Sequence, residues 1–197
     1  GPHTRPVYPS PFSKVEDSST TVLERPDFNF PEGIYVDILP LDGIPSDKSI
    51  VKSHLKTYKF YRHLLFFRGR DPFKHGKGPR SWWPLLIHKV FTLKWLQDKV
   101  HSLMTKYAFD DCEEVIDYDS NEKGIIRKEW LGEPKPYEFE GKTFMGLSKS
   151  DDYLTCMYGD YMTPPPKEKQ IQHNFYYINL EMPYREFCKQ NNITLST

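Results

Sequence analysis

The chain has 197 residues, 38% of them hydrophobic and 15% aromatic, which is enough for one well-packed domain. Its 27 Lys and Arg balance its 27 Asp and Glu, so the net charge gives no argument for a nucleic-acid partner. The charges are unevenly placed, because residues 51–110 carry 13 basic and 3 acidic side chains whereas residues 111–161 carry 6 and 13. Three cysteines without metal-ligand spacing indicate reduced thiols in a cytosolic protein.

The predicted elements begin with an extended lead-in, residues 1–11, which holds four prolines. Residues 12–25 predict a pair of strands or one strand with a turn. The run "EGIYVDILPLDGIPSD" (32–47) predicts one short, mostly buried strand. Ser46 is a good helix N-cap, and a long helix is expected to follow it.

The middle of the chain predicts a basic loop and more helix. Residues 68–80 are rich in Gly, Pro and positive charge, which is typical of a loop. Residues 82–107 predict one or two helices, with Pro84 near the start. No apolar run approaches the ~18 residues needed to span a bilayer.

The last part of the chain predicts shorter elements. Residues 137–147 alternate around Glu140-Gly141 as a β-hairpin does, and residues 150–162 predict a short helix that stops at Gly159. These elements indicate an α+β class in one domain. Its expected parts are the lead-in (1–11), a strand region with Asp37 (12–45), a helical region (46–107) and a mixed C-terminal region (108–197).

Asp37 lies inside an apolar run, where a carboxylate is costly unless a metal, an arginine or backbone N–H groups pair with it. Metal-assisted phosphoryl transfer needs carboxylates that converge on Mg²⁺, and a mid-strand position fixes the direction of one of them. Asp37 fits such a position. Asp42 precedes Gly43 and fits the cap of a turn as well as a ligand. Both aspartates are therefore candidate metal ligands, each with a structural alternative.

Other candidates for binding are weaker. Lys14 fits a phosphate contact or a solvated strand lysine, and His173 fits an acid–base group or a hydrogen-bonded structural histidine. The loop 68–80 fits a site for a phosphate-bearing acceptor or for anionic lipid, or an exposed loop without a ligand. Aromatic residues fit a cation–π box for a quaternary ammonium group or an ordinary core. They are Trp82, Trp83, Trp130, Tyr153, Tyr158, Tyr161, Tyr176 and Tyr177.

Three segments in this order, "PFSKVEDSSTTVLE", "GIYVDILPLDGIP" and "YLTCMYGDYMTPPPKEKQIQH", resemble the LicD family, which includes the fukutin-like proteins. The resemblance implies a nucleotidyltransferase-like fold with a helical C-terminal part. It also implies Mg²⁺-dependent transfer of phosphocholine, or a related phospho-alcohol, from CDP-choline or a similar CDP-alcohol to a sugar. The acceptor would be a cell-surface glycan, such as teichoic acid or lipopolysaccharide, or its lipid-linked precursor. The implied location is cytoplasmic, with peripheral contact at the inner face of the membrane.

The resemblance also implies site residues. Asp37 matches the third carboxylate of the family's Mg²⁺ site, while Lys14, Asp160 and His173 match family segments and are expected cofactor-binding residues without assigned roles. The family's Asp-rich stretch lies N-terminal to "FSKV", so the chain is expected to be N-terminally truncated and inactive by itself. Either it is a fragment, or that stretch is a separate chain, or the protein is a non-catalytic descendant. The rival interpretation is a module of the same fold that binds choline or a glycan without chemistry.

Overall fold

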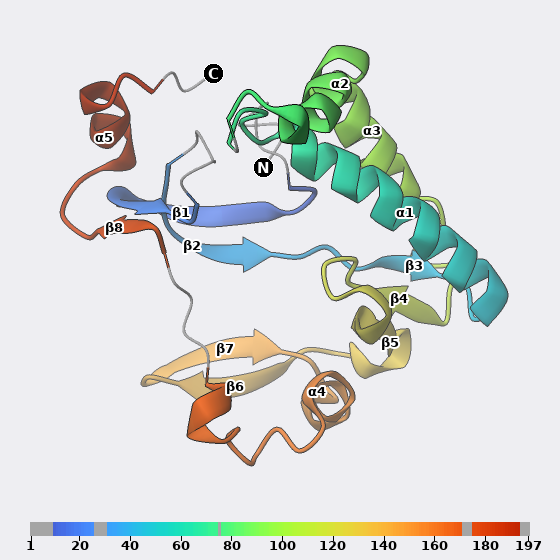
Figure 1. The fold of residues 1–197 in the computed structure, drawn as a ribbon. Coiled ribbons are helices and arrows are strands. Elements are labelled where there is room, and N and C mark those ends of the chain that lie inside the picture. The colour runs from blue at the N-terminus through green and yellow to red at the C-terminus, as the bar shows by residue number, and fades with distance from the viewer. Residues whose placement is uncertain (1–9, 26–30, 75, 171–174, 194–197) are drawn as a thin grey trace. The chain divides into compact units, whose positions relative to one another are not determined.

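The computed structural model describes residues 10–25, 31–74, 76–170 and 175–193, and Figure 1 shows it as a ribbon. The strands are β1 (Ser13–Leu23), β2 (Glu32–Ile38), β3 (Asp42–Ile44), β4 (Glu114–Ile116), β5 (Ile125–Arg127), β6 (Lys135–Phe139), β7 (Lys142–Gly146) and β8 (Tyr177–Asn179). The α-helices are α1 (Lys48–Arg68), α2 (Trp82–Val90), α3 (Leu93–Met104), α4 (Ser150–Tyr158) and α5 (Tyr184–Gln190). Short 3₁₀ helices are η1 (Pro79–Ser81), η2 (Asn121–Gly124), η3 (Lys128–Trp130) and η4 (Lys167–Lys169). This mixture of helices and antiparallel strands confirms the predicted mixed class, while the nucleotidyltransferase-like fold stays a prediction.

The described residues form two compact units, each assembled from segments that are separate in the sequence. The first unit takes the chain up to Leu39, then Thr57–Leu103, then β8 and α5. The second unit takes Pro40–Lys56 and the chain from Met104 through the loop after α4. The boundary at Lys56 falls inside α1, so the first turns of this helix belong to the second unit.

The sheet of the first unit has three antiparallel strands in the order β2-β1-β8, with β1 in the centre. The pairing of β1 with β2 is regular from Ser13 opposite Ile38 to Asp17 opposite Ile34, and then shifts before Val22. Residues 13–23 therefore form one continuous strand with an irregular step, whereas the sequence predicts two strands or one strand with a turn. At the far end of β1, α5 packs on the strand, and the Thr21 hydroxyl donates to the Met182 carbonyl at 2.6 Å.

The strand β2 forms as predicted, but the prediction that it is mostly buried is wrong. Glu32 and Gly33 are buried at its start, whereas Val36 is 70% exposed and Ile38 is 51% exposed. Hydrophobic β-formers predict a strand well because they suit the pleated backbone. These residue types do not by themselves show whether other parts of the protein cover the faces of the strand.

The helical region matches its prediction, apart from the cap of α1. Asp47, not Ser46, caps this helix, because its Oδ1 accepts the backbone N–H of Ser49 at 2.8 Å and of Ile50 at 3.2 Å. The stretch 82–107 forms two helices, α2 and α3. The buried side chains of α1 repeat at helical spacing and include Val51, Leu55, Tyr58, Leu64 and Leu65.

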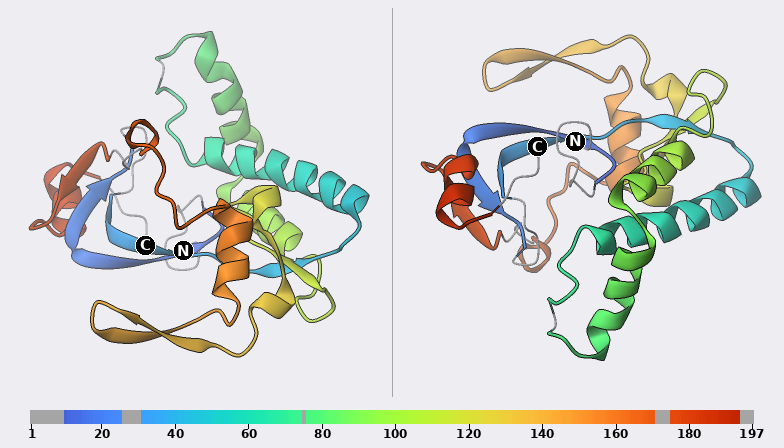
Figure 2. Two further views of the ribbon diagram at one scale, coloured as in Figure 1. Left: turned by 90° about the horizontal axis from the view of Figure 1, so that it is seen from below. Right: turned by 90° about the horizontal axis from the view of Figure 1, so that it is seen from above.

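The second unit contains a small antiparallel sheet in the order β3-β4-β5 and the separate hairpin β6-β7. Its core includes a buried pair in which His54 Nε2 lies 2.7 Å from the Tyr118 hydroxyl. The predicted hairpin turn is confirmed, since Glu140 and Gly141 both have positive φ. Both views in Figure 2 show β6 and β7 as an extended two-stranded ribbon. The helix stop at Gly159 is confirmed by its φ of 71°.

The last part of the chain is mixed rather than helical. After α3 it carries the strands β4 to β8, together with the two short helices α4 and α5. None of the helices in the described ranges combines the length and hydropathy that crossing a lipid bilayer requires.

Candidate functional site

The pairing of β1 with β2 collects polar side chains on one face of the first sheet. Lys14 lies opposite Asp37 and Glu16 lies opposite Tyr35, and residues opposite one another share a face. We call this surface the polar strand face and define it by Lys14, Glu16, Tyr35 and Asp37. Four residues of the "FSKVED" and "GIYVDILP" segments therefore meet although they are about 20 positions apart in the sequence.

Lys14 is the centre of a charge network on the polar strand face. Its Nζ donates to Glu32 Oε2 at 2.8 Å and to Glu24 Oε1 at 3.1 Å. It also lies 3.4 Å from the centroid of the Tyr35 ring, whose hydroxyl donates to Glu24. Because the Lys14 side chain is only 7% exposed, the alternative of a solvated strand lysine is wrong.

Burial and neighbouring charges shift the pKa values of Lys14 and Glu32 in opposite directions. Burial lowers the pKa of Lys14, but the hydrogen bonds and negative charges of Glu32 and Glu24 raise its net pKa above the ordinary value. Burial raises the pKa of Glu32, and the ion pair with Lys14 offsets only part of that rise. One oxygen of Glu32, Oε1, is buried without a hydrogen-bond partner among the described residues. Burial and the hydrogen bond to Glu24 likewise raise the pKa of Tyr35.

Asp37 lies on the polar strand face and is exposed, so its carboxylate is open to solvent rather than buried in a strand. Asp42 is the first residue of β3, opposite Ile116, in the second unit. Asp160 is exposed in the bend after α4, also in the second unit. His173 lies outside the described residues. Lys14 and Asp37 are thus the two predicted site residues that one unit brings together.

A complete metal site is not formed by the described residues. Among them, no group of three or more His, Cys, Asp and Glu side chains could hold a metal ion. Carboxylates nevertheless predominate at the polar strand face, since Glu16 and Asp37 lie on it and Glu24 and Glu32 pair with Lys14. This face therefore attracts cations and offers one exposed carboxylate, Asp37, as a partial ligand set.

The predicted aromatic residues are divided between the units. Tyr177 packs on Phe187 in the first unit, with ring centroids 4.9 Å apart, and both side chains are half-buried. Trp82 and Trp83 are exposed on α2 of the same unit. Tyr161, in the second unit, donates its hydroxyl to Asp151 at 2.6 Å. The cation–π box for choline therefore stays a prediction.

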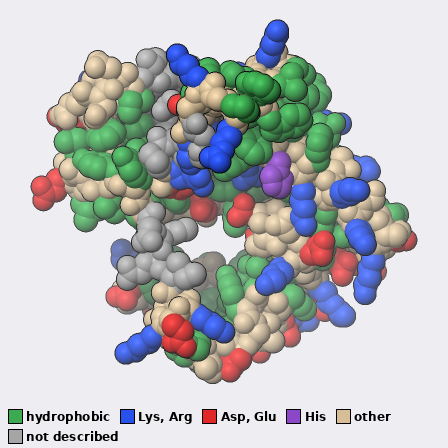
Figure 3. Space-filling model, viewed as in Figure 1, with side chains coloured by type: hydrophobic (Ala, Val, Ile, Leu, Met, Phe, Trp, Pro, Cys, Tyr) green, Lys and Arg blue, Asp and Glu red, His purple; other side chains and the backbone are tan. Residues whose placement is uncertain are grey.

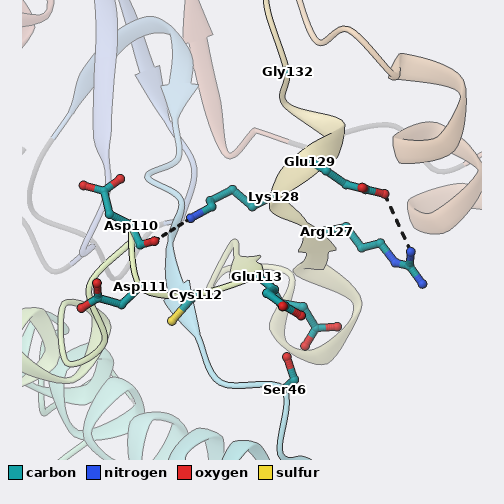
Figure 4. A pocket seen from close by; sticks show the side chains of 10 residues that line it. Ser46, Asp110, Asp111, Cys112, Glu113, Arg127, Lys128, Glu129 and Gly132 are labelled. Atoms are coloured by element: carbon teal, nitrogen blue, oxygen red, sulfur yellow. Dashed lines mark hydrogen bonds and ion pairs between the residues drawn. The ribbon is translucent and has the colours of Figure 1, made fainter.

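The second unit contains a cavity of about 810 Å³ that the sequence did not single out (Figure 4). Most of its lining comes from the segment before β4 and from β5 with η3. The residues that line it are Ser46, Asp110, Asp111, Cys112, Glu113, Glu114, Arg127, Lys128, Glu129 and Gly132. The acidic run 110–114 is the sequence signal for this cavity.

The basic side chains of the cavity are already engaged. Lys128 Nζ donates to the carbonyl oxygens of Phe109 and Asp110 at 2.9 and 3.0 Å. Arg127 Nη1 lies 3.7 Å from Glu129 Oε1, an ion pair that Figure 4 marks with a dashed line. Because the remaining carboxylates outnumber these cations, the cavity disfavours a phosphate group and does not suit an anionic donor.

Comparison with known proteins gives one informative match. The lipopolysaccharide cholinephosphotransferase LicD of Haemophilus influenzae is 25% identical over 173 residues, which cover 85% of this chain and 64% of LicD. The chain thus spans less than two thirds of the length of this relative. No family model and no solved structure matches the chain. The match agrees with the resemblance carried by the three sequence segments, and the chain is a distant relative of LicD.

Proposed function

We propose that the protein acts in the transfer of phosphocholine, or a related phospho-alcohol, from a CDP-activated donor to a sugar of a cell-surface glycan. The observation that carries the proposal is the match to LicD over 85% of the chain. LicD is by name a lipopolysaccharide cholinephosphotransferase. Lipopolysaccharide, teichoic acid and their lipid-linked precursors are the acceptors we consider, at the inner face of a membrane.

The polar strand face supports the proposal chemically. In the transfer, a sugar hydroxyl attacks the phosphorus that carries choline, the bond to the bridging oxygen breaks, and CMP leaves. Mg²⁺, when bound, would neutralise charge on the phosphate oxygens. Asp37 is exposed on a face rich in carboxylates and would supply one ligand. The described residues do not form a group of three or more ligands, so the proposed site would need ligands in addition to those that they supply.

The buried charge network supports a different role for Lys14 from the phosphate contact that the sequence suggested. Its ammonium group is held by Glu24 and Glu32, and its side chain is only 7% exposed. A lysine in this state fixes the strand face next to Asp37 rather than reaching for a ligand. In the proposed site Lys14 is therefore a positioning residue.

The test is calorimetric titration of CDP-choline, with and without Mg²⁺, into this chain and into a longer form that includes an upstream Asp-rich segment. Asp37→Asn is compared with Asp152→Asn, which removes an exposed carboxylate from α4 in the other unit. We expect Mg²⁺-dependent binding by the longer form, abolished by Asp37→Asn and retained in Asp152→Asn. Equal binding by Asp37→Asn and wild type would refute the role of Asp37.

A second candidate function is a binding module for choline or a glycan that performs no chemistry. It is favoured by the lack of a complete metal-ligand group among the described residues. The same titration, together with an assay of CMP release, separates the two candidates. Binding of choline or glycan that ignores both Mg²⁺ and Asp37 supports the module, whereas Mg²⁺-dependent release of CMP from CDP-choline supports the transferase.

A further inference from the structure

The helix α2 presents an exposed apolar face to its surroundings. Trp82, Leu86 and Val90 follow one another at four-residue spacing, and Trp83 lies beside them. At 3.6 residues per turn these four side chains fall within an arc of about 100°. They are 69%, 49%, 59% and 56% exposed, respectively. We call these four residues the tryptophan face.

The opposite side of α2 is anchored, so the tryptophan face has a fixed direction. Ile87 is buried, and His88 Nε2 lies 3.1 Å from the Arg70 carbonyl and 3.3 Å from the Phe67 carbonyl. Arg68, at the end of α1, donates to the Phe91 carbonyl at 3.1 Å. These contacts fix α2, and the residue that follows it, to the C-terminal end of α1. The exposed tryptophans therefore lie on a helix that is held in place against α1.

Positive charge borders the tryptophan face. Lys77, Arg80 and Lys89 are exposed, and the ion pairs of the described residues include none of them. In the sequence from Arg68 to Val90, six Lys and Arg accompany a single acidic residue. Figure 3 shows hydrophobic side chains gathered over the region of α2, with Lys and Arg side chains at its margins.

We propose that the tryptophan face and its basic border bind the surface of an anionic phospholipid bilayer. Tryptophan favours the interface between headgroups and acyl chains, and a helix with an apolar face and flanking cations lies in that interface. Basic residues next to such a face are attracted by anionic headgroups. A neutral protein partner would explain the exposed apolar side chains but not the unpaired charges around them. Membrane binding through α2 and its loop does not depend on the site at Asp37.

Vesicle flotation with the whole chain tests the proposal. Vesicles of pure phosphatidylcholine are compared with equimolar phosphatidylcholine and phosphatidylglycerol, at low and high salt. We expect binding to the anionic vesicles only, weakening steeply as salt screens the charges. Reversal of the border charges, Lys77→Glu/Arg80→Glu/Lys89→Glu, is expected to lower the partition coefficient at least about 100-fold. Trp82→Ala/Trp83→Ala is expected to lower it about tenfold.

Matched controls use exposed residues of the second unit. Phe139→Ala/Phe144→Ala removes two exposed aromatic rings from the β6-β7 hairpin, and Lys135→Glu/Lys142→Glu/Lys167→Glu reverses three exposed charges. Unchanged binding in both controls, with loss in both α2 variants, supports the proposal. Equal loss in the controls, equal binding to neutral vesicles, or no vesicle binding overturns it. If light scattering instead finds a dimer that Trp82→Ala/Trp83→Ala dissociates, without vesicle binding, the face joins two copies of the chain and the membrane proposal fails.

Discussion

Lys14 Nζ lies 2.8 Å from Glu32 Oε2, and this ion pair joins the start of β1 to the start of β2 in a site almost closed to solvent. The Lys14 side chain is 7% exposed and that of Glu32 is 4% exposed. A buried ion pair adds little to stability compared with apolar residues of the same shape, but removing one partner leaves an uncompensated charge. Substitution of Lys14 is therefore expected to destabilise the pairing of the two strands.

Replacing Lys14 by Met should destabilise the fold by about 3 kcal/mol, because Glu24 and Glu32 would lose their shared cation. Glu32→Gln should cost less, since Lys14 keeps Glu24 and the burial penalty on the Glu32 carboxylate disappears. The measurement is the free energy of unfolding in urea at neutral pH. A larger loss for Glu32→Gln than for Lys14→Met would contradict this order.

The same ion pair predicts how stability depends on alkaline pH. The pKa of Lys14 is raised above 10.5 in the folded protein, so its contribution is fully present below pH 10.5 and is lost as pH rises through the folded pKa. Lys14→Met removes this titration while leaving all tyrosines in place. The difference in unfolding free energy between wild type and Lys14→Met should therefore shrink above pH 10.5. A difference that stays constant there would show that Lys14 does not stabilise the fold through its charge.

Gly33 marks a close approach between the backbones of β1 and β2. A Cβ atom at this position would lie 2.0 Å from the Asp17 carbonyl oxygen, which is backbone and cannot rotate away. Gly33→Ala should therefore destabilise the protein by about 2 kcal/mol or more, as overpacking does in other cores. Gly78 has no heavy atom within 4 Å of such a Cβ, and Gly78→Ala is the matched control. Gly33→Ala should have a clearly lower midpoint of thermal unfolding than Gly78→Ala, and equal midpoints would argue against the close approach.

The cap of α1 can be tested by comparing neighbouring substitutions. Asp47→Ala should lower the urea midpoint, because Oδ1 of Asp47 accepts from two backbone N–H groups of the first turn. Ser46→Ala should leave it nearly unchanged. Hydrogen bonds from Ser49 and Ile50 lower the pKa of Asp47 below 3.8, so its contribution should persist above that pH and disappear as pH falls through the folded pKa. A midpoint that responds to Ser46 and not to Asp47 would reverse the assignment.

Local chemistry made some of these elements predictable from the sequence. The turn at Glu140-Gly141 and the helix stop at Gly159 need positive φ angles, which Gly provides at little cost. The sequence predicts the cap of α1 one position too early, because Ser46 and Asp47 are both good caps and only the backbone geometry distinguishes them.

The features that could not be predicted from the sequence depend on contacts between residues that are distant along the chain. Lys14 meets Glu24 and Glu32 only because β1 and β2 pair in one register, and no local pattern near Lys14 names these partners. The exposure of Asp37 depends on what covers β2, which an apolar alternation does not specify. The cavity beside β5 likewise needs residues from both sides of β4. The family segments, in contrast, could be identified without any of this geometry.

The place of β8 at the edge of the first sheet has a consequence for synthesis of the chain. Residues 177–179 pair with the last residues of β1, so the central strand lacks its second neighbour until these residues have left the ribosome. The second unit draws only on residues that emerge earlier and can form first. Premature termination before Tyr177 would therefore release a polypeptide whose β1 keeps an open hydrogen-bonding edge, which is a template for aggregation.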